Sequence, residues 1–150
     1  DEYDFNGLCT QKTLPNGQVV KIGYNKEGMV TKTTFVAEDE NGEDISVFYE
    51  YDAMGNVSSV TDAEGRCVKL TYDLNGNLTE IIYPDGTKDV TEYDALGRVV
   101  QSTPRSGRAT AYAYDESGNI VRMTQGEQTT AYEYDLLGRM VRQIGNRVCL

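Results

Sequence analysis

Residues 93–99 read Tyr-Asp-Ala-Leu-Gly-Arg-Val, and variants of this stretch recur along the whole 150-residue chain. The shared pattern is Tyr-Asp, two variable residues, Gly, Asn or Arg, and then an apolar residue. Five close copies begin at Tyr51, Tyr72, Tyr93, Tyr114 and Tyr134, and two looser copies begin at Tyr3 and Tyr24. Successive tyrosines are 21, 27, 21, 21, 21 and 20 residues apart. Such regular spacing predicts a repeat protein, in which each copy is one supersecondary unit.

Asp-x-x-Gly is a turn sequence. We expect the Asp carboxylate to accept hydrogen bonds from backbone N–H groups just ahead of it, and the two middle residues to form a type I turn. Gly accepts the positive φ that sends the chain back antiparallel. The residues expected to shape these turns are Tyr51, Asp52, Gly55, Tyr72, Asp73, Gly76, Tyr93, Asp94, Gly97, Tyr114, Asp115, Gly118, Tyr134, Asp135 and Gly138.

A second set of glycine turns lies between most copies, at Gly17, Gly65, Gly86, Gly107 and Gly126. In Pro15-Asn16-Gly17 and Pro84-Asp85-Gly86, Pro presets φ and Gly accepts a positive φ. A turn therefore recurs about every 10–11 residues, which leaves room for one strand of ordinary length between turns. The predicted strands include Arg66–Tyr72, Leu78–Tyr83, Thr87–Tyr93 and Arg108–Tyr114.

These turns and strands predict an all-β fold, a curved and spiralling antiparallel sheet of tandem β-hairpins. About a dozen strands in one meander would make a wide sheet, and wide open sheets usually curl or split. A propeller is the alternative, because two 21-residue units approach the length of a four-stranded blade. Residues 1–150 are expected to form a single repeat array and a fragment of a longer one, because isolated end strands would be unpaired.

The composition limits the partners. A net charge of −10 disfavours duplex nucleic acid and anionic membrane surfaces. No apolar run approaches the roughly 20 residues that span a bilayer. The odd set Cys9, Cys67 and Cys149 indicates separate small apolar residues, although oxidation of one pair stays open.

The sequence also argues against catalysis. It contains no His, so it has no His-based triad or His metal site. The repeated Asp residues are interpreted as turn caps, since seven similar turns need seven similar caps. We therefore expect no enzymatic activity, no cofactor and no metal site. The Asp39–Asp44 loop is expected to be solvated and acidic, because calcium binding there would lack the EF-hand spacing.

Two other positions have competing interpretations. Tyr112 and Tyr132 could contact a ligand such as a sugar, but tyrosines at fixed strand positions more often pack between neighbouring strands. Arg98 and Arg139 stand where other copies have Asn, and this interchange suggests an exposed polar position.

The Tyr-Asp-x-x-Gly-Asn/Arg-apolar units resemble the YD repeats of bacterial Rhs and wall-associated proteins, toxin-complex shells and animal teneurins. The resemblance is best from Tyr49 to Val141. It implies a hollow β-shell, which in the toxin members encloses a toxic C-terminal segment. Those toxins often end the shell with an Asp-Pro motif linked to self-cleavage, and this sequence contains no Asp-Pro.

The resemblance therefore implies a non-enzymatic shell segment of a secreted or cell-surface bacterial protein. Its implied partners are neighbouring YD repeats of the same long chain and an enclosed C-terminal effector segment. The alternative is a cell-surface adhesion module that binds carbohydrate or a protein receptor.

Overall fold

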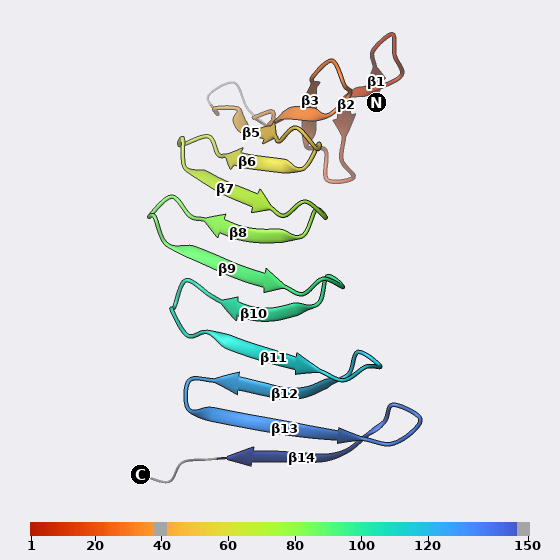
Figure 1. The fold of residues 1–150 in the computed structure, drawn as a ribbon. Coiled ribbons are helices and arrows are strands. Elements are labelled where there is room, and N and C mark those ends of the chain that lie inside the picture. Colours follow the sequence, from red (N-terminus) through yellow and green to blue (C-terminus); the bar gives the residue numbers. More distant parts are fainter. Residues whose placement is uncertain (38–41, 147–150) are drawn as a thin grey trace. The chain divides into compact units, whose positions relative to one another are not determined.

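The computed structural model describes residues 1–37 and 42–146, and it arranges them in antiparallel strands (Figure 1). The strands are β1 (Glu2–Tyr3), β2 (Cys9–Thr13), β3 (Val19–Tyr24), β4 (Val30–Phe35), β5 (Ile45–Tyr51), β6 (Val57–Thr61), β7 (Cys67–Tyr72), β8 (Leu78–Ile82), β9 (Lys88–Tyr93), β10 (Val99–Thr103), β11 (Thr110–Tyr114), β12 (Ile120–Gln125), β13 (Gln128–Tyr134) and β14 (Met140–Asn146). Nowhere in these residues is there a helix long and apolar enough to cross a membrane.

The chain divides into two compact units, Asp1–Leu70 and Thr71–Leu150. Within each unit, strands that are hydrogen-bonded neighbours in the sheet are also consecutive in the chain. In the second unit, for example, β9 pairs with β8 and β10, and β12 pairs with β11 and β13. The predicted fold class, an all-β antiparallel array of tandem hairpins, is confirmed. The meander order also disfavours the propeller alternative.

The predicted strands lie where the sequence placed them, with ends that differ by one or two residues. β7 begins one residue after the predicted start at Arg66, and β11 begins two residues after Arg108. The turn residues Tyr83 and Thr87 lie just outside β8 and β9. Their backbone groups close the turn instead, because the Tyr83 amide donates to the Thr87 carbonyl at 2.9 Å.

Several hairpins that carry a Tyr-Asp turn have a bulge beside the turn. In the β9–β10 pair, Tyr93 is opposite Val99 and Glu92 is opposite Gln101, so Val100 is an extra residue on β10. A type I turn followed by a left-handed Gly has this geometry, and it matches the twist of the two strands. The same register shift adjoins the Tyr-Asp turns of the β5–β6, β11–β12 and β13–β14 pairs.

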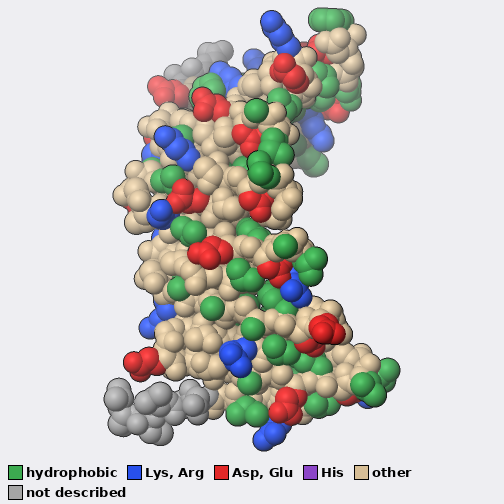
Figure 2. Space-filling model, viewed as in Figure 1, with side chains coloured by type: hydrophobic (Ala, Val, Ile, Leu, Met, Phe, Trp, Pro, Cys, Tyr) green, Lys and Arg blue, Asp and Glu red, His purple; other side chains and the backbone are tan. Residues whose placement is uncertain are grey.

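The sheet has little fully buried apolar surface. Among the described hydrophobic residues, only Val20 is buried, and the buried polar residues are Thr34 and Ser59. Most strand side chains are half-buried, and Figure 2 shows hydrophobic side chains on the visible face interspersed with acidic and basic ones. The backbone ladder and the turns must therefore contribute much of the stability that a central core supplies in other folds.

Two departures from the 21-residue spacing have local causes. The 27-residue interval contains the connection between β4 and β5, which includes residues 36–44. Glu38, Asp39, Glu40 and Asn41 lie outside the described residues, and three of them belong to the six-residue Asp39–Asp44 loop. The 20-residue interval contains a two-residue turn, Gly126-Glu127, between the paired residues Gln125 and Gln128.

Candidate functional site

The Tyr-Asp turn is the unit from which the candidate site is built. In the turn between β9 and β10, Asp94 Oδ1 accepts hydrogen bonds from the backbone N–H groups of Leu96 and Arg98, at 2.9 and 3.0 Å. The Gly97 amide donates to the Asp94 carbonyl, and the Asp94 amide donates to the Arg98 carbonyl. Gly97 has a φ of +77°, a conformation that residues with a Cβ rarely adopt.

The other close copies share this geometry. In each, the turn Asp accepts a bond from the amide four residues ahead, at 2.9 Å for Asp52, Asp73 and Asp135 and at 2.8 Å for Asp115. The corresponding glycines, Gly55, Gly76, Gly118 and Gly138, all have positive φ. Tyr24-Asn25 uses an amide in place of the carboxylate, since Asn25 Oδ1 accepts from the amides of Glu27 and Met29.

The second carboxylate oxygen explains why Asn and Arg interchange after the glycine. Both residues supply a side-chain N–H that reaches Asp Oδ2. The bonds are Asn56–Asp52 at 3.1 Å, Asn77–Asp73 and Asn119–Asp115 at 2.9 Å, and Arg98–Asp94 and Arg139–Asp135 at 2.7 Å. The expectation that this position is exposed is wrong for all of these residues except Arg139. The hydrogen bond to the turn Asp keeps the Asn or Arg side chain against the turn.

These hydrogen bonds lower the pKa of the turn carboxylates. For Asp52, Asp73 and Asp115, the largest cause of the lowered pKa is the side-chain N–H of the Asn four residues ahead. For Asp94 and Asp135, the largest cause is the backbone N–H of the Arg at that position. Each bond favours the ionised carboxylate, so all five are charged at neutral pH.

In five of the turns, the tyrosine connects the turn to the preceding repeat. The Tyr93 hydroxyl donates to the carbonyl of Leu78, the first residue of β8, at 2.9 Å. The same bond joins Tyr24 to Cys9, Tyr51 to Val30, Tyr114 to Val99 and Tyr134 to Ile120. We call this bond the tyrosine staple. It fastens the end of one hairpin to the start of the strand that follows the previous Tyr-Asp turn.

Arg98 strengthens one of these junctions. Its guanidinium lies over the ring of Tyr114 at 4.6 Å from the centroid, and its Nη1 donates to the Asp115 carbonyl at 3.4 Å. Arg98 thus contacts its own turn through Asp94 and the next Tyr-Asp turn through two further groups. A cation over a tyrosine ring is attracted by the negative face of the ring.

A further cluster joins two of the turns at the opposite ends of the strands. The Tyr83 hydroxyl donates to Asp89 Oδ2 at 2.7 Å, and the Arg105 amide donates to Asp89 Oδ1 at 2.6 Å. The Arg105 guanidinium lies 4.7 Å from the centre of the Tyr83 ring. The bond with Asp89 raises the pKa of Tyr83 and lowers that of Asp89. Sequence reasoning missed this cluster, because its members share no motif.

The two proposed ligand-contact tyrosines are not brought to one place. In the strand register, Met123 of β12 lies opposite Tyr112 of β11 on one side and opposite Thr130 of β13 on the other. Tyr132 is therefore two residues along β13 from the position level with Tyr112. Both tyrosines are half-buried. Tyr132 lines an open hollow of about 600 Å³ between the Asp115 and Asp135 turns.

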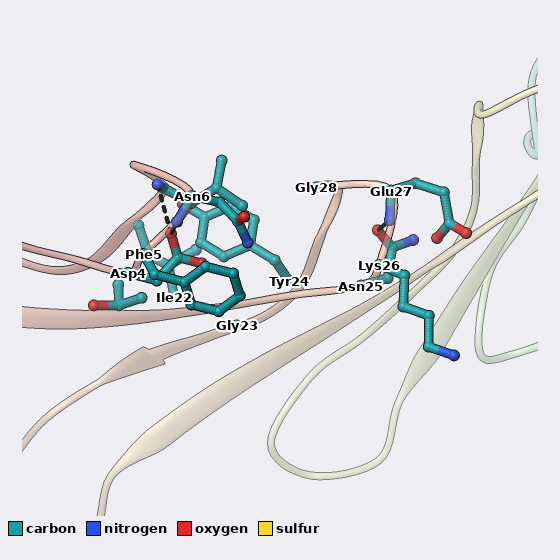
Figure 3. A pocket seen from close by; sticks show the side chains of 12 residues that line it. Asp4, Phe5, Asn6, Ile22, Gly23, Tyr24, Asn25, Lys26, Glu27 and Gly28 are labelled. Carbon is teal, nitrogen blue, oxygen red and sulfur yellow. Dashed lines mark hydrogen bonds between the residues drawn. The ribbon is translucent and has the colours of Figure 1, made fainter.

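Similar hollows lie between other consecutive Tyr-Asp turns. One of about 670 Å³ separates the turns at Asp4 and Asn25, and one of about 710 Å³ separates those at Asn25 and Asp52. Figure 3 shows side chains of both turns around the first hollow, including Phe5 and Tyr24. The sequence analysis did not predict these hollows, although the spacing of the turns implies them.

The remaining chemistry-bearing residues form no evident site. Within residues 1–37 and 42–146 there is no group of three or more His, Cys, Asp and Glu that could hold a metal ion. Cys9 and Cys67 are free thiols, and Cys149 lies outside the described residues.

Sequence comparison identifies the repeat. The profile described as RHS Repeat matches residues 51–88 and 93–129, which together make up half of the chain. The chain belongs to the RHS repeat family. The matched residues of this Rhs-repeat chain include four of the five close Tyr-Asp copies. Comparison with curated protein sequences gave no match.

Solved structures share the Rhs-repeat fold. A Photorhabdus luminescens Tc holotoxin pore with a mutant TccC3 is 19% identical, with a TM-score of 0.69. TcdB2–TccC3 without its hypervariable C-terminal region is 19% identical, with a TM-score of 0.71, and a TcdB2–TccC3–TEV form is 20% identical, with a TM-score of 0.73. Each match covers 93% of this chain and 8% of the other chain. The Rhs-repeat chain therefore spans a small part of those proteins.

Proposed function

We propose that this chain is a wall segment of an Rhs-repeat shell, within a longer repeat array that encloses a C-terminal effector polypeptide. The protein containing it would be a secreted or cell-surface bacterial protein. The observation that carries the proposal is the tyrosine staple in a chain of the RHS repeat family. Each staple joins consecutive hairpins at the same end of the strands, as in Tyr93–Leu78 and Tyr114–Val99. A chain of such junctions favours a continuous wall over separate hairpins.

The mechanism of such a wall is physical. Paired strands satisfy backbone hydrogen bonds along the sheet, so the wall can separate a cargo polypeptide from solvent and from proteases. The Tyr-Asp turns contribute by fixing where each strand ends. Their carboxylates support a structural, non-enzymatic role, because Asp52, Asp73 and Asp94 each bond to N–H groups of their own turn. Those carboxylate oxygens already accept hydrogen bonds within their own hairpins.

Limited proteolysis of the full protein tests this proposal. The rate at which the distal segment is digested should be compared between the full protein and the isolated distal segment. Enclosure predicts that the segment in the full protein is cut much more slowly. Equal digestion rates would contradict enclosure and leave the wall without a cargo.

The second candidate is an adhesion module that binds carbohydrate or a protein receptor. It is favoured by the hollow beside Tyr132, where an aromatic ring lies close to the polar side chains of Asp115 and Asn119. Sugars combine an apolar face with hydroxyl groups, so aromatic and polar neighbours suit them. A glycan array tests this function. Binding that is lost in Tyr132→Ala would favour adhesion, and a blank array would count against carbohydrate binding.

A further inference from the structure

The turn between β10 and β11 differs from the other glycine turns in its first residue (Figure 1). Pro104 takes the position that Asp62 takes in the turn between β6 and β7. There, the Asp62 amide donates to the Arg66 carbonyl at 3.1 Å and helps to close the turn. Proline has no N–H, so the same bond from Pro104 to the Arg108 carbonyl cannot form. The turn keeps the other closing bond, from the Gly107 amide to the Pro104 carbonyl at 2.7 Å.

Strand pairing also stops earlier beside this turn. Ser102 is the last residue of β10 that pairs with β11, and its partner is Thr110. In the β6–β7 hairpin, pairing continues to the last residue of β6 and the first residue of β7. Arg108 and Ala109 therefore follow the turn glycine outside any strand, and residues 104–108 are all exposed. This hairpin presents an unpaired segment where the β6–β7 hairpin presents a closed turn.

Arg108 differs in the same way from the other arginines that follow a turn glycine. Arg66, Arg98 and Arg139 each donate from Nε to the aspartate that begins their turn, at 2.7 Å. With proline in place of that aspartate, Arg108 forms no ion pair or side-chain hydrogen bond with a described residue. An exposed arginine on an unpaired segment suits a protease whose specificity pocket carries a carboxylate.

Contacts of the other arginine in the turn distinguish the two possible cleavage positions. The Arg105 amide donates to Asp89 Oδ1 at 2.6 Å, and the Arg105 guanidinium lies 4.7 Å from the centre of the Tyr83 ring. These contacts fix Arg105 against the neighbouring hairpin, so it cannot adopt the extended form that a protease binds without losing them. Arg108 loses no such contact, so its peptide bond is the more accessible of the two.

We propose that the peptide bond between Arg108 and Ala109 is a processing site for an arginine-specific serine endoprotease. The protease serine attacks the Arg108 carbonyl carbon, and the bond from that carbon to the Ala109 nitrogen breaks. The nitrogen takes up a proton and leaves as an amine, and water then hydrolyses the acyl-enzyme to release the Arg108 carboxylate. This inference goes beyond the proposed function, because it depends on one turn and not on whether a shell encloses cargo.

The contacts around the cut would keep the two fragments together. The pairing of β10 with β11 begins at Ser102 and does not involve the cleaved bond. The Tyr114 hydroxyl still donates to the Val99 carbonyl, and the Arg98 guanidinium still lies over the Tyr114 ring. The nicked protein should therefore elute as one species under native conditions and separate into two fragments in denaturant.

Brief digestion of the full protein with trypsin tests the proposal, with mass spectrometry to identify new N-termini. We expect the N-terminus at Ala109 to form about tenfold faster than the one at Cys67, because Arg66 lies in a closed turn. Arg108→Gln should remove the Ala109 N-terminus. Equal rates at Ala109 and Cys67, or a faster cut after Arg105, would overturn the proposal.

Two reciprocal substitutions test whether the open turn is the cause. Pro104→Asp supplies an N–H for the Arg108 carbonyl and a carboxylate for its side chain, so it should slow this cut about tenfold while the arginine remains. Asp62→Pro opens the matching turn and should speed the cut after Arg66 about tenfold. Both positions follow a strand residue, which is the conformation that proline favours before it.

Circular dichroism shows whether each variant is folded, and either variant alone can decide the outcome. An unchanged cleavage rate in a folded Pro104→Asp or Asp62→Pro protein would overturn the proposal. The N-terminus scored here lies within the repeat array, whereas the enclosure experiment scores the distal segment. Failure of one result therefore leaves the other standing.

Discussion

The Tyr51 hydroxyl donates a 2.7 Å hydrogen bond to the Val30 carbonyl, 21 residues earlier in the chain. In the regular repeats the same staple spans 15 residues, as from Tyr93 to Leu78. The six additional residues lie in the connection between β4 and β5, so the strand register and the staple are unchanged. The staple is therefore a property of the paired strands, and the loop at the other end can vary in length without disturbing it.

This relationship predicts that Tyr51→Phe lowers the free energy of unfolding by about 1 kcal/mol, the net value of a typical hydrogen bond. The ring remains in place, so the loss reports the hydroxyl alone. Urea unfolding followed by circular dichroism measures the change. Tyr49→Phe is the control, because the Tyr49 hydroxyl bonds to no described residue and lies on the same strand. Equal losses in both variants would argue against the staple.

Much of the repeat could be predicted from the sequence, for a clear physical reason. Asp-x-x-Gly encodes a turn locally, since Asp94 and Gly97 act on backbone groups within four residues of each other. The staple could not be predicted, because the reach of Tyr93 to Leu78 depends on the pairing register and the bulge. The interchange of Asn and Arg after the glycine suggests an exposed position, and that expectation is wrong because both side chains bond to Asp Oδ2 in the folded turn.

The hydrogen bonds that Asp94 accepts predict an order of stability for two substitutions of this residue. Asp94→Ala removes the acceptor for the Leu96 and Arg98 amides. Asp94→Asn keeps an oxygen for them, as Asn25 does for its own turn, and loses the ion pair with Arg98. The urea midpoint should therefore fall in the order wild type, Asp94→Asn, Asp94→Ala. An alanine variant as stable as the asparagine variant would show that these amide bonds contribute little.

Gly97 tests the backbone contribution separately. A Cβ at this position would meet Asn77 at 3.7 Å, an ordinary contact, so space is available and the φ of +77° alone opposes substitution. Gly97→Ala should destabilise by about 1 kcal/mol, and Gly97→Val by more, because β-branched residues tolerate positive φ poorly. Gly23→Ala is the matched control, since Gly23 lies in β3 without a positive φ and its Cβ would make a 3.6 Å contact with Lys32. It should be close to neutral in thermal unfolding.

The lowered pKa values of the turn carboxylates predict that the stability of the fold depends on pH. Asp52, Asp73 and Asp115 have pKa values lowered from the ordinary 3.8, chiefly by the side-chain N–H of Asn56, Asn77 and Asn119. A lowered pKa in the folded state contributes stability that is present above the unfolded pKa and is lost as pH falls through the folded pKa. The urea midpoint should therefore be steady from neutral pH down to about 5 and then fall steeply below pH 4.

The matched variant replaces these three aspartates by asparagine, which keeps an acceptor oxygen for the turn amides and cannot ionise. The triple variant should be less stable at neutral pH, and its urea midpoint should fall less between pH 5 and pH 2, because fewer groups take up protons on unfolding. Parallel curves for the variant and the wild type would show that the acid sensitivity does not come from these three carboxylates. Converging curves would assign it to the carboxylates of Asp52, Asp73 and Asp115.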